Sequence, residues 1–192
     1  MKLLLYCTKS KPRLMINRRN EYKTDLDKDV IVTNNPITFN GYIVAECDFE
    51  VEEIECRISI GINGIHDEYT TKSLGENELL FASKIDEITF INYLKGKNGY
   101  AIHIKNLHIF DKPKELSDFY SINENAKELD IEEDIKEIKK APQNMMYAFE
   151  FSKNIFERKV LISIRPEWLC KILNGEKTIE IRKRVLKEML WN

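Results

Sequence analysis

Residues 162–182 read ISIRPEWLCKILNGEKTIEIR, and they carry the signals of a strand, a helix and a second strand in succession. The apolar residues 160–164 predict the first strand. Pro166 then favours a helix start, because proline lacks only a hydrogen-bond donor that the first turn of a helix leaves unpaired in any case. Gly175 predicts the end of that helix, since glycine adopts the left-handed conformation easily. The second strand is expected to begin at Lys177.

This second strand carries three charges within six residues, which is dense for a purely structural strand. They are Lys177, Glu180 and Arg182. Successive side chains of a strand point to opposite faces. Glu180 and Arg182 therefore share one face, and Ile179 and Ile181 are expected on the other face, in the core. Lys177 lies on the isoleucine side by parity, but its place at the turn would let it reach over the rim.

The charges admit two interpretations. In the first, Arg165, Lys177 and Arg182 offer positive charge to a phosphate or a nucleobase in a cleft. Glu180 then accepts a hydrogen bond from a base edge or a substrate amide. Lys177 is the best single candidate for such a role. In the second interpretation, Glu180 forms a surface salt-bridge ladder with Arg182 or Lys177, and this ladder contributes little to stability.

Composition limits the class of protein. The chain has 192 residues, 43% of them hydrophobic, which suits one well-packed core. The formal net charge of −2 argues against a broadly basic nucleic-acid coat, although a local basic site is compatible with it. No apolar run approaches the roughly 18 residues of a membrane helix, and the N-terminal run is too short for a signal peptide. We therefore expect a cytoplasmic protein without a membrane partner.

The cysteines give no sign of a metal site. The four of them are scattered along the chain without a C-x-x-C pair. This spacing is typical of reduced thiols in a cytosol. We therefore expect neither a bound metal nor another cofactor.

The rest of the pattern predicts a β-rich chain. Several short strands with two or three flanking helices indicate an α+β fold, a small β-barrel of about five to seven strands. A helix is expected within residues 79–94, where apolar residues recur at near-helical spacing, and residues 61–75 read as a loop. Strands are expected at residues 2–8, 42–49, 51–60, 100–110 and 145–151.

Residues 120–140 read as a charged insertion. Within them, the segment 124–137 contains seven acidic residues and few apolar ones. Such a composition cannot bury enough apolar surface to form a core element. The segment is interpreted as a solvated helix or a mobile insertion.

The charged strand and its lead-in resemble the ASCH domain, a member of the PUA-like group of small β-barrels. The signature of that family is a glycine, a lysine two positions on, and then a glutamate and an arginine at alternating positions. Gly175, Lys177, Glu180 and Arg182 reproduce it in full. The lead-in, residues 163–168, is similar to phage and prophage members of the family.

The likeness continues through the chain, but in a rotated order. Segments that follow the signature in the family precede it here, and they are residues 5–9, 40–46, 99–104, 111–116 and 141–147. Three explanations fit: a circular permutant that closes one barrel alone, a piece of a tandem array, and a tail that completes a neighbouring chain's barrel in a domain-swapped homodimer. We favour the first, a single permuted domain over residues 1–192. Its barrel body is expected at 1–152 and its signature unit at 160–192.

The resemblance implies a module that binds RNA or a modified nucleoside, by analogy with the PUA-like group. In the family order, the segment with Tyr6 and Thr8 directly follows the signature strand. The implied ligand-binding residues are therefore Ser163, Arg165, Lys177, Glu180, Arg182, Tyr6 and Thr8.

Two alternatives stay open. The first is an enzyme at the same cleft, a ribonuclease or a nucleoside amidohydrolase, with Lys177 and Glu180 as catalytic residues. Some small relatives resemble amidohydrolases of acetylated cytidine and use the motif lysine with a threonine three residues on. Here Glu180 stands at that third position. The second alternative is a phage accessory protein whose acidic segment 124–137 engages a basic partner protein.

Overall fold

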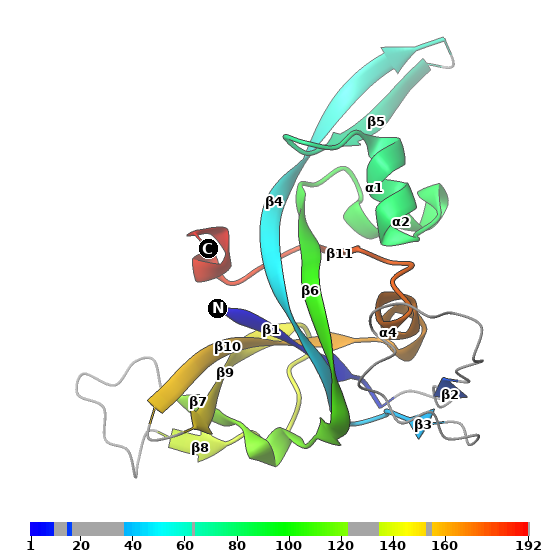
Figure 1. Cartoon of the computed structure of the whole chain (residues 1–192). Helices are drawn as coiled ribbons and strands as arrows, with labels where there is room; N and C mark the ends of the chain where they lie inside the picture. The colour runs from blue at the N-terminus through cyan, green and yellow to red at the C-terminus, as the bar shows by residue number, and fades with distance from the viewer. Residues whose placement is uncertain (10–14, 17–36, 63, 123–134, 153–154, 192) are drawn as a thin grey trace. The chain divides into compact units, whose positions relative to one another are not determined.

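The computed structural model divides the chain into two compact units (Figure 1). The first unit comprises Met1–Asp48 and Asn106–Leu173, and the second comprises Phe49–Lys105 and Asn174–Asn192. Each unit is therefore built from two segments far apart in the sequence. The structure describes residues 1–9, 15–16, 37–62, 64–122, 135–152 and 155–191.

Two long strands contribute to both units. They are β4 (Ile43–Gly61) and β6 (Gly99–Lys114). The boundary between the units falls after Asp48 in β4 and after Lys105 in β6. The expected strands 42–49 and 51–60 are thus one continuous strand, and the expected strand 100–110 is confirmed in a longer form.

The strands of the first unit follow the order β4-β1-β10-β9-β7-β8. Strand β1 pairs in parallel with β10, and every other pairing along this order is antiparallel. A separate antiparallel pair joins β2 (Met15–Ile16) to β3 (Ile37–Thr38). The other bounds are β1 Lys2–Cys7, β7 Tyr120–Ile122, β8 Ile135–Glu137, β9 Met145–Ser152 and β10 Ile155–Ile164, with a 3-10 helix, η2, at Leu116–Asp118.

Strand β1 is central in the first unit because nearly all of its residues are apolar. Residues 3–7 are all buried, on both faces of the strand, between β4 and β10. A continuous apolar run is typical of a strand that is covered on both sides. Leu4 and Tyr6 pack there with Leu161 of β10, and a cluster with Phe119 and Ala148 completes this core.

Helix α4 (Pro166–Leu173) begins at the expected proline and packs against β1. Its buried side chains include Leu169, Ile172 and Leu173, which recur at the spacing of one helix face. Gly175 follows with a φ of 73°, the left-handed conformation that stops a helix. The strand and helix predicted for residues 160–173 are therefore confirmed.

The second unit orders its strands β11-β6-β4, with β5 paired to β4 on the other side. Helix α1 packs against both β5 and β11. Its buried core combines residues of the sheet with residues of both helices: Ile54, Tyr69, Leu79, Phe90, Leu94, Ala101, Ile179 and Ile181. The bounds are β5 Gly64–Thr70, α1 Glu76–Ser83, α2 Glu87–Leu94 and β11 Ile179–Arg182, with a 3-10 helix, η3, at Lys187–Trp191.

One expectation for this unit is wrong and another is incomplete. The segment 61–75, expected as a loop, contains strand β5, which forms a hairpin with β4 (Figure 1). The helix expected within 79–94 is present as α2, and the end of a second helix, α1, falls in the same range. The break comes at Lys84, whose φ is 55°, and Asp86 then caps α2 by accepting a hydrogen bond from the backbone N–H of Thr89. A left-handed residue ends a helix, and an aspartate cap starts the next one.

The α+β class expected from the sequence is confirmed, and three α-helices flank strands in the described part of the chain. A closed barrel is not shown. In the described pairings, β8 has β7 as its neighbour and β11 has β6, so the strand order ends at both strands instead of returning on itself. The signature unit is divided: β10 and α4 belong to the first unit, and β11 belongs to the second.

The expected charged insertion at 120–140 lies largely outside the described residues, because 123–134 are not described. What is described of it forms the short antiparallel pair β7 and β8. The last three residues of the acidic segment, Ile135–Glu137, are therefore in a strand and not in a helix.

Gly99, at the start of β6, has no room for a side chain. A Cβ atom there would lie 2.7 Å from Leu94 Cδ2 and 3.2 Å from the backbone oxygen of Arg182. Because Leu94 is fully buried, Gly99→Ala is expected to lower the free energy of unfolding by about 1–3 kcal/mol through overpacking. Urea unfolding measures this difference.

A double-mutant cycle tests the cause of that loss. In the Leu94→Ala background the nearest clashing atom is gone, so Gly99→Ala should cost clearly less than it does in the wild type. An equal cost in both backgrounds would assign the loss to the strand backbone and contradict the steric explanation.

Candidate functional site

The charged segment enters the second unit between a helix end and a strand. The backbone N–H of Thr178 donates to the carbonyl oxygen of Ala82 at the end of α1, at 3.0 Å. The carbonyl of Thr178 in turn accepts from the N–H of Ile104 in β6, at 2.9 Å. Residues 177–178 are thereby fixed before β11 begins.

Lys177 is fully buried in the second unit. Its Nζ donates to the carbonyl oxygen of Ser83 at 2.6 Å and lies 3.3 Å from Glu180 Oε2. Ser83 is the last residue of α1, where carbonyl groups lack partners within the helix and where a positive charge is favourable. No basic residue occupies the last turn of α1 itself, so Lys177 acts as its cap from a distant part of the sequence. The alternative in which Lys177 reaches over the rim does not describe its position.

Glu180 joins two cations. Its Oε2 faces Lys177, and its Oε1 lies 2.9 Å from the Nη2 of Arg182. Glu180 is buried and Arg182 is mostly so. Their neighbours Ile179 and Ile181 are in the core, as the strand alternation predicted. The result is a buried cluster of two positive charges and one negative charge, defined by Lys177, Glu180 and Arg182 and called here the charged cluster.

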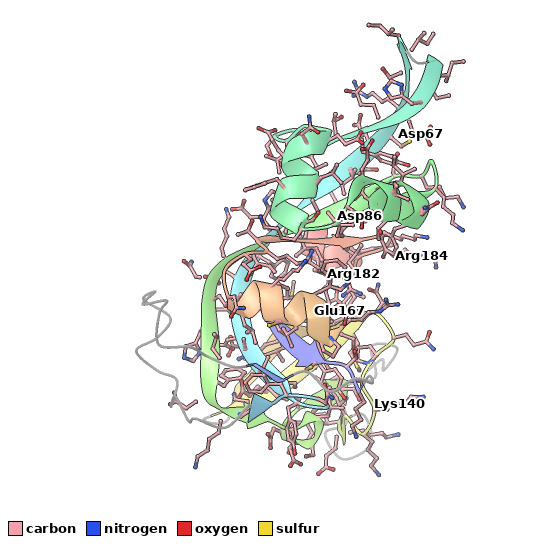
Figure 2. The ribbon with its side chains drawn as sticks, turned by 90° about the vertical axis from the view of Figure 1, so that its right-hand side faces the viewer. Asp67, Asp86, Lys140, Glu167, Arg182 and Arg184 are labelled. Carbon is pink, nitrogen blue, oxygen red and sulfur yellow. The ribbon has the colours of Figure 1, made fainter. Side chains whose placement is uncertain are left out.

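Positive charge continues along the chain beyond β11. Figure 2 shows Arg182 and Arg184 on this segment of the second unit. Lys183, Arg184 and Lys187 are exposed, and no acidic residue interrupts residues 182–187. The Nζ of Lys183 lies 4.8 Å from the ring centroid of Tyr93 on α2. We call residues 182–187 the basic run.

Sequence reasoning singled out Arg182 but missed the rest of the basic run. The signal was present, since four cations within six residues are visible in the sequence alone. The aromatic neighbour could not be predicted from the sequence, because Tyr93 is about ninety positions away and only the fold brings α2 beside Lys183.

The other four predicted residues lie in the first unit, where β1 and β10 end side by side. Tyr6 and Ser163 are register partners, and the N–H of Thr8 donates to the carbonyl oxygen of Ile164 at 3.0 Å. The side chains of Tyr6 and Ser163 are buried. Burial raises the pKa of the Tyr6 phenol, with a further contribution from Cys7. Arg165 is exposed directly after the strand.

The seven predicted site residues therefore fall into two groups in different units. The Ser163 hydroxyl donates to the carbonyl oxygen of Pro142 at 2.7 Å, and Tyr6 packs in the core. Both contacts are those of structural side chains. The role of Tyr6, Thr8, Ser163 and Arg165 in ligand binding stays a prediction.

Two cysteines are poorly suited to nucleophilic chemistry. Desolvation raises the pKa of the Cys7 thiol to about 12, and Glu167 adds to the shift. Desolvation likewise raises the pKa of Cys47 to about 12. Because the thiolate is the reactive form, neither thiol is activated. Among the described residues, no group of three or more histidine, cysteine or acidic side chains is placed to hold a metal ion.

His103 lies on β6 in the second unit, where it contacts a carboxylate. Its Nε2 is 3.3 Å from Glu52 Oε2, which also accepts a hydrogen bond from the Ser73 hydroxyl at 2.7 Å. The carboxylate thus stands between the hydroxyl and the imidazole. A serine nucleophile needs the imidazole in that middle position to remove its proton. The order of the three groups therefore does not suit that chemistry.

The chain was compared with protein family models, curated proteins and solved structures. No protein family model matches the chain, and no curated protein or solved structure matches it significantly. Within the described residues, no helix has the length and apolar character needed to cross a membrane.

Proposed function

We propose that the protein binds RNA or a modified nucleoside through the second unit, at the basic run and the Arg182 end of the charged cluster. The observation that carries this proposal is the continuity of positive charge from the buried cluster to exposed Lys183, Arg184 and Lys187. The chain as a whole has a net charge of −2. A concentration of cations against that background is the electrostatic footprint expected of a phosphate-binding surface.

The charged cluster supports a role beyond stability. Burying ions costs several kcal/mol each, and apolar residues of similar volume often stabilise a core as well or better. Glu180 lies between the two cations, 3.3 Å from Lys177 and 2.9 Å from Arg182.

The aromatic neighbour supports a nucleic-acid ligand over a simple anion. Tyr93 is partly exposed beside Lys183. Single-stranded nucleic acids are bound by cations that follow the backbone, combined with aromatic rings on which bases stack. Lys183 and Tyr93 place one of each side by side.

The geometry argues against a catalytic role for Lys177. Its side chain is fully buried, and both carboxylate oxygens of Glu180 already face a cation. A nucleophile or general base must reach the substrate. Lys177 and Glu180 are therefore assigned to positioning Arg182, and the enzyme alternative becomes an outcome of the experiment below.

We further propose that the chain is an ASCH-like, PUA-like domain whose elements stand in rotated order, of the phage or prophage type and cytoplasmic. The support is the complete signature, together with local structure that suits it. Gly175 adopts the left-handed conformation, and Ile179 and Ile181 anchor the charged strand in the core. The proposal includes a closed barrel, formed either by one chain or by two chains in a domain-swapped dimer.

The experiment is fluorescence anisotropy with a labelled, mixed-sequence single-stranded RNA pool at several salt concentrations. Binding should weaken as salt rises, because cations that neutralise phosphates release counterions. The variant Lys183→Gln/Arg184→Gln should bind more weakly. Its slope of log affinity against log salt should be smaller by about 1.4, at about 0.7 per phosphate contact for single strands.

The matched control is Lys72→Gln/Lys97→Gln, which removes two exposed lysines of the same unit outside the basic run. It should retain nearly the wild-type slope. Equal losses in both variants would reduce the binding to non-specific charge and contradict the proposed site. Gel analysis of the same samples reports cleavage, and cleavage lost on Arg182→Gln would favour the ribonuclease alternative.

A further inference from the structure

The hairpin of β4 and β5 exposes an apolar face in the second unit. Its strands pair from Glu55 opposite Thr70 to Gly61 opposite Gly64. Four isoleucines stand there: Ile58, Ile60, Ile62 and Ile65, with 75%, 82%, 106% and 75% of their surface exposed. Ile60 lies directly opposite Ile65. We call these four residues the isoleucine patch.

Three of these side chains belong to one face of the hairpin, and the fourth, Ile62, follows in the turn beyond the end of β4. Side chains at positions i and i+2 of a strand share a face, which aligns Ile58 and Ile60. The register adds Ile65, the partner of Ile60. Arg57 lies on the opposite face by the same alternation, and it pairs there with Glu55 at 2.6 Å.

The same face is covered by helices at the base of the hairpin. Cys56 is the partner of Tyr69, and the ring of Tyr69 packs edge-on against Phe90 of α2, with centroids 5.2 Å apart. Ile54, two positions before Cys56, is fully buried in that core. The alternation of core residues thus continues outward past the helices. In the part of the second unit that the structure describes, nothing covers its outer half, and contiguous exposed patches of this kind mark interaction sites.

The charge of this face indicates which kind of partner could bind to the isoleucine patch. Asp67, labelled in Figure 2, is the register partner of Ile58. The two side chains therefore share a face, and Asp67 is half-buried. Its carboxylate lies beside Gly96, at the end of α2. Of the described residues, none places a cation within ion-pair distance of it. Packing the same face of a second copy against it would bury two such carboxylates without a cation. A partner that places its own cation beside Asp67 would fit this face.

The dimensions fit a helix. From Ile58 to the strand end at Gly61, β4 advances three residues, roughly 10 Å at 3.3 Å per residue. An α-helix covers that length with about seven residues, at 1.5 Å each. Helices α1 and α2 already occupy the inner half of the same face, so a helix would extend an existing layer.

We propose that the isoleucine patch is the docking surface for an amphipathic helix of another protein. That helix carries an apolar stripe of about two turns flanked by lysine or arginine, with one cation against Asp67. The inference rests on a different surface from the basic run and does not depend on RNA binding.

Two synthetic helical peptides test it. Both have the same leucine stripe, and their polar positions are lysine in one and glutamate in the other. By fluorescence anisotropy, the wild type should bind the lysine peptide at least tenfold more tightly than the glutamate peptide. Ile60→Asp should weaken binding of the lysine peptide at least tenfold, and Asp67→Asn should reduce the preference between peptides by about threefold.

The control is Ile88→Asp on α2, an isoleucine that is 73% exposed outside the patch. It should bind like the wild type, and circular dichroism should show both aspartate variants folded. Equal binding of the two peptides, binding of neither, or equal losses in Ile60→Asp and Ile88→Asp would each overturn the proposal. Self-association of the wild type, or retention on phosphatidylglycerol vesicles, that Ile60→Asp abolishes would also overturn it and assign the patch to a second copy or to lipid.

Discussion

Replacing Lys177 by methionine is expected to lower the free energy of unfolding by roughly 3–5 kcal/mol, the cost of removing one partner from a buried ion pair. Methionine has a similar volume, so the loss reports the ammonium group and not a cavity. Two buried acceptors would lose their donor: Glu180 Oε2 and the carbonyl oxygen of Ser83. Urea unfolding of the second unit, followed by circular dichroism, measures the difference.

Two further variants isolate the cause. Lys183→Met removes an exposed cation from the same segment and should change stability by less than about 0.5 kcal/mol. The double variant Lys177→Met/Glu180→Met should be less destabilised than the sum of the single changes, because the contact between Lys177 and Glu180 is counted in both of them. It also removes the contact of Glu180 with Arg182, as Glu180→Met alone does. A loss below about 1 kcal/mol in Lys177→Met would show that the ammonium does not cap α1 in solution.

Because Lys177 is expected to stabilise the second unit, its replacement is a poor test of ligand binding. A variant of Lys177 would lose affinity if the fold around Arg182 loosened, whether or not the lysine touches RNA. The exposed pair Lys183 and Arg184 avoids that ambiguity. Stability and binding can then be assigned to different residues of one segment.

The sequence was informative where a local pattern alone determines an element. The apolar run of β1, the proline start of α4 and the alternation of Ile179 and Ile181 in β11 were each read correctly. In these segments, the residues that set the element lie within a few positions of one another. Burial then follows directly from periodicity.

Prediction from the sequence failed where a segment distant in the chain determines the local structure. Strand β5 contains His66, Asp67 and Glu68 and reads as polar, but it pairs with β4 along its whole length. The position of Lys177 depends on Ser83, 94 residues earlier in the chain. The interleaving of segments from both halves of the chain into each unit has no local signal at all.

Replacing Lys159 by methionine is the matching prediction for the first unit, with an expected loss of roughly 3–5 kcal/mol. Lys159 is buried in β10, and its Nζ lies 2.8 Å from Glu46 Oε2 and 2.6 Å from Glu150 Oε2. Without the ammonium, Glu46 loses this contact, and Glu150 keeps its pair with Lys114 at 2.6 Å. Lys2→Met serves as the control, because the Lys2 to Asp48 pair is largely exposed and should contribute about 0–1 kcal/mol.

The pH dependence of that loss distinguishes an ion pair from simple packing. Burial alone would raise the pKa of Glu150, but hydrogen bonds from Lys114 and Lys159 outweigh it and hold the pKa below its ordinary value of 4.5. Burial alone would lower the pKa of Lys159, but hydrogen bonds from Glu150 and Glu46 outweigh it and hold the pKa above 10.5.

The signs follow from linkage. The contribution of Glu150 is present above pH 4.5 and is lost as the pH falls through its lowered folded pKa. The contribution of Lys159 is complete below pH 10.5 and is lost as the pH rises through its raised folded pKa. The stability difference between wild type and Lys159→Met should therefore be largest between these values and shrink toward both ends. Urea unfolding at pH 3, 7 and 11 measures it. A large difference that stays constant from pH 3 to pH 11 would contradict the ion-pair explanation, because a contribution from the two charges must change as they titrate.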